Sequence, residues 1–144
     1  MYFTKPLPML AACTLVLHGT WEYLHIALYT GYEVMEGVLP VWVLATLGDL
    51  LYTFVICATI SLVKGNSVWI RNAAWHEVFA AALIGFLVAL MVEYKGLYLG
   101  RWEYLPSMPI VPFLGIGLSP LLQMTLITPL SLLVTKLLAK RIYQ

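Results

Sequence analysis

Residues 6–29, PLPMLAACTLVLHGTWEYLHIALY, form an apolar run that is long enough to cross a bilayer as a helix. The second half of this run nevertheless carries ionisable side chains. A charged group in hydrocarbon costs several kcal/mol, so a membrane chain keeps such groups only where a cavity, a partner or a reaction uses them. The run therefore predicts a membrane protein with a polar interior site, whose first members are His18, Glu22 and His25.

The composition also indicates a membrane protein. Hydrophobic residues make up 62% of the 144 residues and charged residues only 10%, whereas a soluble domain carries about 25% charged residues. The length suits one domain, so we expect residues 1–144 to form a single transmembrane domain. The formal net charge of +1 offers no electrostatic basis for binding nucleic acid.

Three further apolar runs have the length of a membrane helix. They cover residues 40–63, 75–95 and 111–138. Short links between such runs are typical of helices that pack as antiparallel neighbours. The sequence thus predicts an all-α, polytopic membrane protein that folds as an antiparallel bundle of four transmembrane helices.

The basic residues predict how this bundle is oriented. Cytoplasmic loops of membrane proteins carry an excess of lysine and arginine. Only Lys95 and Arg101 lie on the side opposite to the chain termini. We therefore expect a multi-pass protein of the cell (inner or plasma) membrane with both termini in the cytoplasm. The basic residues on the terminal side are Lys5, Lys64, Arg71, Lys136, Lys140 and Arg141.

The polar residues of the first run share one helix face. Tyr29 extends the stripe of His18, Glu22 and His25, because these positions follow the i, i+4, i+7 and i+11 spacing of a helix. The stripe could be a hydrogen-bond network between helices. It could be a metal site formed by the two histidines and the glutamate, or an acid–base or substrate-binding group. The residue types alone identify no cofactor.

The second run supplies another carboxyl group, Asp49. Counted inward from Pro40 at 1.5 Å per residue, Asp49 lies about 14 Å deep, at a depth similar to that of Glu22. Two carboxyl groups that lie close together cannot both ionise freely, and such pairs serve acid–base catalysis. Alternatively, Asp49 simply pairs with a histidine. The candidate catalytic residues are Glu22, Asp49, His18 and His25.

The segment before the fourth run is rich in proline. Pro106, Pro109 and Pro112 recur at every third position, a spacing that suits an extended chain better than a helix. We expect residues 101–123 to form a lid over the outer end of the bundle. An ordinary loop followed by a kinked helix is the alternative.

Two further prolines predict a proline-broken fourth helix. Pro120 and Pro129 each lack the N–H that would bond the carbonyl four residues earlier. Irregular backbone at membrane depth persists only where protein or a water-filled cavity covers it. Gln123 lies near this break, and we expect it to face the polar site.

Four side chains around the predicted lid are candidate ligand-binding residues. Glu93 approaches the outer end of the third run. Arg101 could clamp a carboxylate or phosphate, or it could pair with Glu93 or Glu103. Tyr52 belongs to the polar stripe of the second run. The candidate ligand-binding residues are Glu93, Arg101, Tyr52 and Gln123.

The last third of the chain contains Gly100-Arg101-Trp102-x-Tyr104, then Met108-Pro109, then Leu118-x-Pro120-x-x-Gln123. This pattern resembles small four-helix membrane proteins of bacteria and archaea that have no assigned function, and the resemblance implies a topology and no activity. Glu93, followed by an aromatic-x-aromatic pair and prolines, is more distantly similar to integral-membrane carotenoid cyclases and hydratases. The Pro-Glu-Glu element of the cyclases is missing here, so we carry over no catalytic residue.

Two classes of function fit these features. The first is a small membrane enzyme that binds a lipid or isoprenoid and acts on it by proton transfer. The second is a non-enzymatic transporter, proton path or accessory subunit of a membrane complex, because intramembrane acids serve proton relays equally well. The expected partner is membrane lipid, with a homo-oligomer or a larger complex under the second interpretation.

Overall fold

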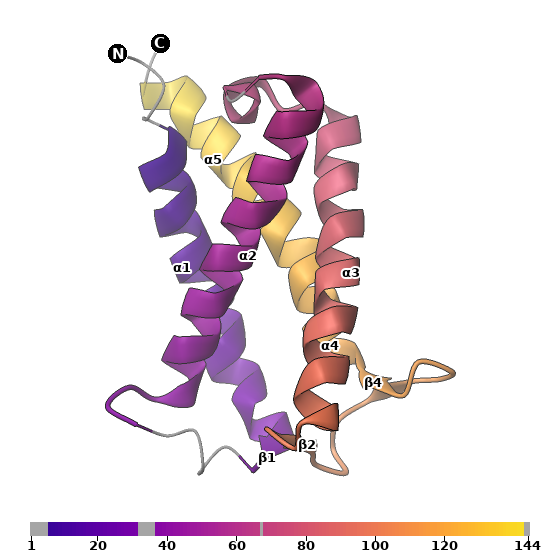
Figure 1. The fold of residues 1–144 in the computed structure, drawn as a ribbon. Helices are drawn as coiled ribbons and strands as arrows, with labels where there is room; N and C mark the ends of the chain where they lie inside the picture. Colours follow the sequence, from indigo (N-terminus) through magenta and orange to yellow (C-terminus); the bar gives the residue numbers. More distant parts are fainter. Residues whose placement is uncertain (1–5, 32–36, 67, 143–144) are drawn as a thin grey trace.

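The computed structural model describes residues 6–31, 37–66 and 68–142, which form four helical rods (Figure 1). The rods run alternately up and down, so that α1 begins and α5 ends at the same end of the bundle, here called the terminal end. The opposite end is called the far end. The first three rods are α1 (Pro6–His25), α2 (Val41–Lys64) and α3 (Trp75–Tyr98), and the fourth joins α4 (Leu118–Leu122), the π-helical segment η4 (Gln123–Ile127) and α5 (Thr128–Ile142).

Each rod packs against two neighbours. The α1 helix contacts α2 and α5, while α3 contacts α2, α5 and η4. A short 3-10 helix, η3 (Trp69–Asn72), packs against α5 and covers the terminal end. The core of the terminal half is mainly apolar and closely packed. Its fully buried side chains include Leu10, Ile56, Ile70 and Leu132, together with the hydroxyl residues Thr14, Ser131 and Thr135.

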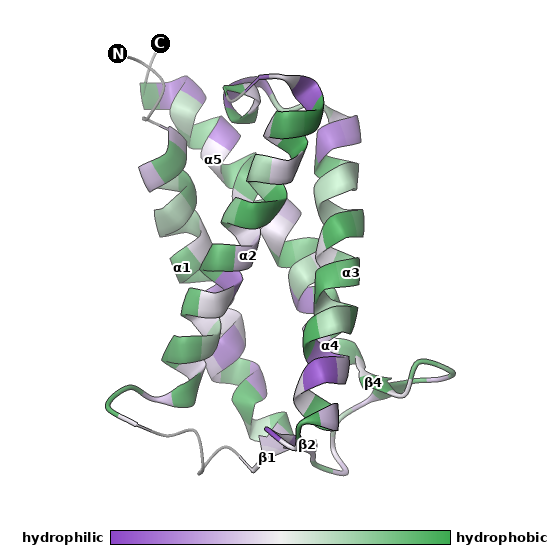
Figure 2. Cartoon of the chain, in the orientation of Figure 1, coloured by the Kyte–Doolittle hydropathy of each residue, from purple (hydrophilic) through white to green (hydrophobic). Residues whose placement is uncertain are grey.

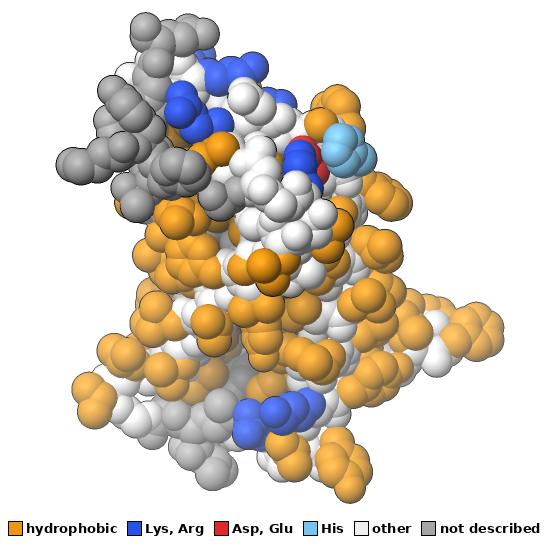
Figure 3. Space-filling view, turned by 45° about the horizontal axis from the view of Figure 1, so that its top comes forward, with side chains coloured by type: hydrophobic (Ala, Val, Ile, Leu, Met, Phe, Trp, Pro, Cys, Tyr) orange, Lys and Arg blue, Asp and Glu red, His pale blue; other side chains and the backbone are white. Residues whose placement is uncertain are grey.

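The outward faces of the rods are apolar. Figure 2 shows hydrophobic residues along the length of the bundle, and Figure 3 shows an apolar belt with lysine and arginine side chains above and below it. Within the described ranges, three helices are long and apolar enough to cross a membrane: Val41–Lys64, Trp75–Tyr98 and Leu118–Ile142. The α1 helix is not among them, because its polar stripe lowers its mean hydropathy. These three helices support the expected membrane protein.

The first helix is shorter than expected. It ends at His25 and is followed by the 3-10 turn η1 (Ile26–Leu28) and the strand β1 (Tyr29–Thr30). The β1 strand pairs antiparallel with β2 (Glu103–Tyr104), which places Tyr29 opposite Tyr104. The expected helix through Tyr29 was therefore wrong, because its backbone bonds to a distant segment instead of continuing the helix.

The fourth helix begins at Leu118 rather than near residue 111. A second antiparallel pair, β3 (Ile110–Val111) and β4 (Ile116–Gly117), precedes it. The fold is thus mostly helical rather than all-α. Because Pro120 lies in the first turn, where no intrahelical donor is needed, it does not break the helix.

The irregular part of the fourth rod lies farther along, in η4. Pro129 cannot donate to the carbonyl of Thr125 and its ring crowds that carbonyl, and the wider π turn lies directly before it. The α3 helix packs closely on this turn. A Cβ atom at Gly85 would overlap the carbonyl oxygen of Met124, so only glycine permits this approach.

Candidate functional site

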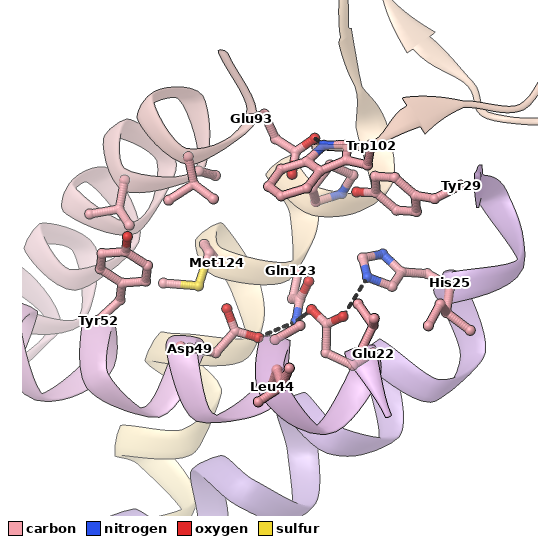
Figure 4. Close-up of a pocket in the computed structure, with 18 of the residues that line it drawn as sticks. Glu22, His25, Tyr29, Leu44, Asp49, Tyr52, Glu93, Trp102, Gln123 and Met124 are labelled. Atoms are coloured by element: carbon pink, nitrogen blue, oxygen red, sulfur yellow. Dashed lines mark hydrogen bonds and ion pairs between the residues drawn. The ribbon is translucent and has the colours of Figure 1, made fainter. Parts of the chain in front are cut away.

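Side chains from three rods meet at a buried amide. Gln123 Nε2, at the start of η4, lies 2.8 Å from Glu22 Oε1 and 2.7 Å from Asp49 Oδ2 (Figure 4). A side-chain amide has two N–H groups, so it can donate one to each carboxyl group. The carboxyl groups of Glu22 and Asp49 also lie close enough to interact directly. Gln123 therefore bridges the two acids.

His25 supports the first of these acids. Its Nε2 atom lies 3.1 Å from Glu22 Oε2, and its Nδ1 atom lies 2.9 Å from Ser119 Oγ. The ring fits the neutral tautomer in which Nε2–H donates to the carboxylate and Nδ1 accepts from the hydroxyl. This assignment of the proton follows from the partners of the two nitrogens. Both oxygens of Glu22 are then engaged, by Gln123 and His25.

His18 supports the second acid in the same manner. Its Nδ1 atom lies 3.2 Å from Asp49 Oδ2, and its Nε2 atom lies 3.4 Å from Thr128 Oγ1. The carboxylate again receives the ring N–H, and the hydroxyl faces the other nitrogen. Gln123 and His18 both donate to the same oxygen of Asp49. Its other oxygen, Oδ1, accepts no hydrogen bond from the described residues.

A pocket of about 280 Å³ lies beside this cluster, and Glu22, His25, Asp49 and Gln123 form part of its lining. The volume is close to the lower end of the range of about 300–1,000 Å³ that is typical of small-molecule sites. The walls between the polar groups are mostly apolar. They come from α2, α3 and η4 and include Leu44, Ala45, Val88, Ala89, Val92 and Met124.

A third acid, Glu93, lines the same pocket from α3 and is only 5% exposed. Its Oε2 atom lies 2.5 Å from the hydroxyl oxygen of Tyr104 and 3.4 Å from Trp102 Nε1. Burial, and then the hydrogen bond to Glu93, raise the pKa of Tyr104 above its ordinary value, so the phenol keeps its proton and donates. A Cβ atom at Gly96 would overlap the indole of Trp102, so this glycine makes room for the ring.

The structure brings most of the candidate residues together. Tyr52 and Glu93 line the pocket beside the bridged acids, while Arg101 lies exposed at its rim. Arg101 makes no ion pair with the described residues. The expected pair of Arg101 with Glu93 does not form, and Tyr104 and Trp102 donate to that glutamate instead. The hydrogen-bonded cluster contains His18, Glu22, His25, Asp49 and Gln123.

The expected lid forms only in part. Of residues 101–123, Arg101, Trp102, Pro120 and Gln123 line the pocket. The β3–β4 hairpin instead projects sideways from the bundle in Figure 1. Phe113 in its turn is fully exposed and has a φ angle of 69°, a conformation that is rare for a bulky residue. The hairpin therefore does not cover the site.

A metal site at His18, Glu22 and His25 is not supported by the geometry. The two histidines turn to different carboxyl groups, His25 to Glu22 and His18 to Asp49. Among the residues that the structure describes, no group of three or more His, Cys, Asp or Glu side chains could hold a metal ion. The helical spacing places the three residues on one face but does not make their ligand atoms converge.

The sequence interpretation missed four residues that form hydrogen bonds to the site: Trp102, Tyr104, Ser119 and Thr128. Trp102 and Tyr104 are two residues apart in an extended segment, so their shared direction could have been inferred. Ser119 and Thr128 bond the histidines. Thr128 lies five residues after Gln123, a separation that aligns two side chains in a π turn; Pro129 indicated irregular backbone here but not the π type of the turn.

No protein-family model, curated protein or solved structure matches this chain. What the site can do must therefore be inferred from the chemistry of its side chains.

Proposed function

We propose that this chain is a small polytopic membrane protein whose pocket binds an apolar molecule from the bilayer, a lipid or an isoprenoid, and exchanges protons with it. One observation carries this proposal. Asp49 lines a mostly apolar pocket, has one oxygen that no described donor occupies, and is held through its other oxygen by Gln123 and His18. A carboxyl group with this arrangement is suited to proton transfer with a bound apolar molecule.

All four rods would cross the membrane under this proposal. The α1 helix turns its polar stripe inward and exposes apolar residues such as Val16 and Leu24, so its modest hydropathy is compatible with a span. Basic side chains on the described terminal end outnumber those on the far end. The excess favours a cytoplasmic terminal end in a plasma or inner membrane. The basic residues on the terminal end are Lys64, Arg71, Lys136, Lys140 and Arg141.

The ligand would enter sideways from the bilayer. The pocket is lined by both α2 and α3, and these two helices diverge toward the far end in Figure 1. Figure 3 shows a hollow in that half of the surface, with basic side chains at its edge. Because the walls are mostly apolar, a hydrocarbon chain is the occupant that they suit best.

The two bridged acids would share one proton. Two negative charges so close together repel strongly where the surroundings are apolar, and Glu22 and Asp49 are linked through one amide. The protonated form of such a pair donates and the ionised form accepts, which is the pattern of acid–base sites built from two carboxyl groups. Asp49 would contact the ligand. Glu22 would be a positioning residue, since both its oxygens are already bonded.

The non-enzymatic alternative of a proton path is less well supported. Such a path requires polar groups or water across the whole membrane. In the described core, the terminal half is filled mainly by apolar side chains such as Leu10, Ile56, Ile70 and Leu132, none more than 1% exposed. The buried hydroxyls of Ser131 and Thr135 there donate to carbonyls of their own helix. The polar cluster therefore opens to a pocket on one side and meets a closely packed, mainly apolar core on the other, which favours a bound ligand.

Solvent deuterium tests the proposed proton transfer. The purified protein is incubated in D₂O with bilayers of a total lipid extract, and the lipids are examined by mass spectrometry. We expect one lipid class to gain deuterium at carbon with the wild type and with Glu103→Gln, whose exposed carboxyl group lies outside the pocket. Asp49→Asn should abolish the gain. Equal labelling with Asp49→Asn, or no labelling with the wild type, would contradict proton transfer.

A further inference from the structure

Glu93 is the pocket carboxyl group that forms no hydrogen bond or ion pair with a histidine, lysine or arginine among the described residues. Both of its hydrogen bonds, from Tyr104 and Trp102, reach the same oxygen, Oε2. The other oxygen, Oε1, accepts none, and Figure 4 shows it turned toward the interior of the pocket. Because Glu93 is only 5% exposed, this oxygen faces the pocket rather than bulk solvent.

The charges around the pocket are unbalanced. Three carboxyl groups line it, and the one cation in its lining, Arg101, is exposed at the rim and forms no ion pair with the described residues. Tyr104 and Trp102 are neutral donors, so they leave the charge of Glu93 without a counter-ion. An ionised carboxylate buried without a counter-ion is costly, and a cation brought by a ligand would offset that cost.

Aromatic rings complete the surroundings of Glu93. The indole of Trp102 and the ring of Tyr29 line the same end of the pocket (Figure 4). The ring of Tyr29 packs 5.4 Å from that of Tyr104 and 5.3 Å from that of His25. Aromatic faces attract cations, and aromatic rings beside a carboxylate are a recurring way to bind an ammonium group.

The depth of the two free oxygens suits an amphiphile. Glu93 lies five residues before the end of α3, or about 8 Å inside the far end at 1.5 Å per residue. Asp49 lies eight residues into α2, or about 12 Å deep. A head group at Glu93 would therefore sit nearer the membrane surface, while its chain would reach past Asp49 along the apolar wall.

We propose that Glu93, Trp102 and Tyr29 form the head-group end of the pocket, and that they bind the protonated amine of an amphiphile. The inference rests on the proposed function only in taking the pocket to hold an apolar chain. Glu93 supplies the charge and a free acceptor oxygen, and the rings of Trp102 and Tyr29 supply the faces. The ligand class is thus an amphiphile with a protonated amine head and a hydrocarbon chain.

Decylamine and decanol distinguish an amine from a hydroxyl head on the same chain. The protein is reconstituted in lipid nanodiscs, each probe is added at the same mole fraction in the bilayer, and thermal unfolding is followed at neutral pH, where the amine is protonated. Binding to the folded state raises Tm with ligand concentration. We expect the wild type to bind decylamine more tightly than decanol by at least about tenfold, because a buried charge pair is formed.

Two variants assign this preference to Glu93. Glu93→Gln keeps the size of the side chain and should reduce the preference for decylamine to about that for decanol. The matched control Glu103→Gln removes an exposed carboxyl group of the neighbouring strand and should keep the preference. If Glu93→Gln does not fold, Tyr104→Phe serves instead, since it leaves the carboxylate in place and should retain the amine preference.

Three results would overturn the assignment: equal binding of both probes by the wild type, an unchanged amine preference in Glu93→Gln, or a lost preference in a folded Tyr104→Phe. None of these results would contradict the apolar pocket itself, because that pocket is tested separately by the lipid that co-purifies with the protein. If the wild type retains lipid but does not prefer the amine, the proposed pocket stands and the proposed head-group site is wrong.

Discussion

Gln123 Nε2 lies 2.7 Å from Asp49 Oδ2, and this bond ties the π-helical segment of the fourth rod to the middle of α2. The same nitrogen lies 2.8 Å from Glu22 Oε1 on α1. One amide of the fourth rod thus connects the acids of the other two rods, Glu22 on α1 and Asp49 on α2. Two stability predictions follow from the position of this amide and the packing of its π turn.

Gln123→Leu should destabilise the fold. The substitution leaves two buried carboxyl groups without their shared donor, which costs about 1–3 kcal/mol in the free energy of unfolding. Thermal unfolding in detergent measures the change. The control is Thr125→Val on the same segment, whose hydroxyl donates only to the carbonyl of Leu121. The bridge would have no energetic importance if both variants unfolded at the same temperature.

Gly85→Ala should also destabilise the fold, through the packing of α3 on η4. The added Cβ would overlap the Met124 carbonyl, and relieving that overlap costs about 1–3 kcal/mol. Gly48→Ala is the control, because a Cβ there meets nothing within 4 Å. It should be neutral or stabilising, since alanine favours a helix over glycine by up to about 1 kcal/mol. Equal Tm values for the two variants would contradict the close contact.

Tyr104→Phe and Arg101→Ala compare two residues at the start of the expected lid. Tyr104 donates to the buried Glu93, so its loss should lower the free energy of unfolding by about 1–3 kcal/mol. Arg101 is exposed and unpaired within the described structure, so Arg101→Ala should leave the free energy of unfolding unchanged. Chemical denaturation of the two variants in the same detergent measures both effects. A large loss of stability for Arg101→Ala would instead favour the ion pair with Glu93 or Glu103 that the sequence allowed.

Cysteine labelling tests the proposed orientation. Asn66 and Ser107 are exposed at the terminal and far ends respectively. In intact cells, a membrane-impermeant maleimide should label Ser107→Cys and not Asn66→Cys, because the excess of basic residues predicts a cytoplasmic terminal end. Permeabilised cells should show labelling of both. Labelling of Asn66→Cys from outside would contradict the proposed topology and indicate the opposite orientation.

Helical periodicity explains how much of the site the sequence could predict. The spacing of His18, Glu22 and His25 fixed their common face, because all three lie within one regular helix. Residue counting placed Asp49 at the depth of Glu22 for the same reason. The expected meeting of Gln123 with these acids also agrees with the geometry, since the prolines around it indicated irregular backbone there.

The remaining features depend on contacts that periodicity does not encode. Tyr29 leaves the helix because its strand pairs with that of Tyr104, far along the chain. Thr128 reaches His18 only through the extra residue of a π turn. Glu93 has neutral partners rather than Arg101, because an extended segment turns both Trp102 and Tyr104 toward it. Each case is a tertiary interaction that prevails over local sequence preference.

The lipid that co-purifies with the protein tests the pocket most directly. Ala89→Phe fills the pocket, since Ala89 lines it and is buried, whereas Leu87→Phe adds the same ring to an exposed position of α3. Both variants should elute from gel filtration as the wild type does. Extraction and mass spectrometry should recover the same bound molecule from the wild type and from Leu87→Phe, and none from Ala89→Phe. Equal recovery from all three proteins would contradict the claim that this pocket holds an apolar ligand.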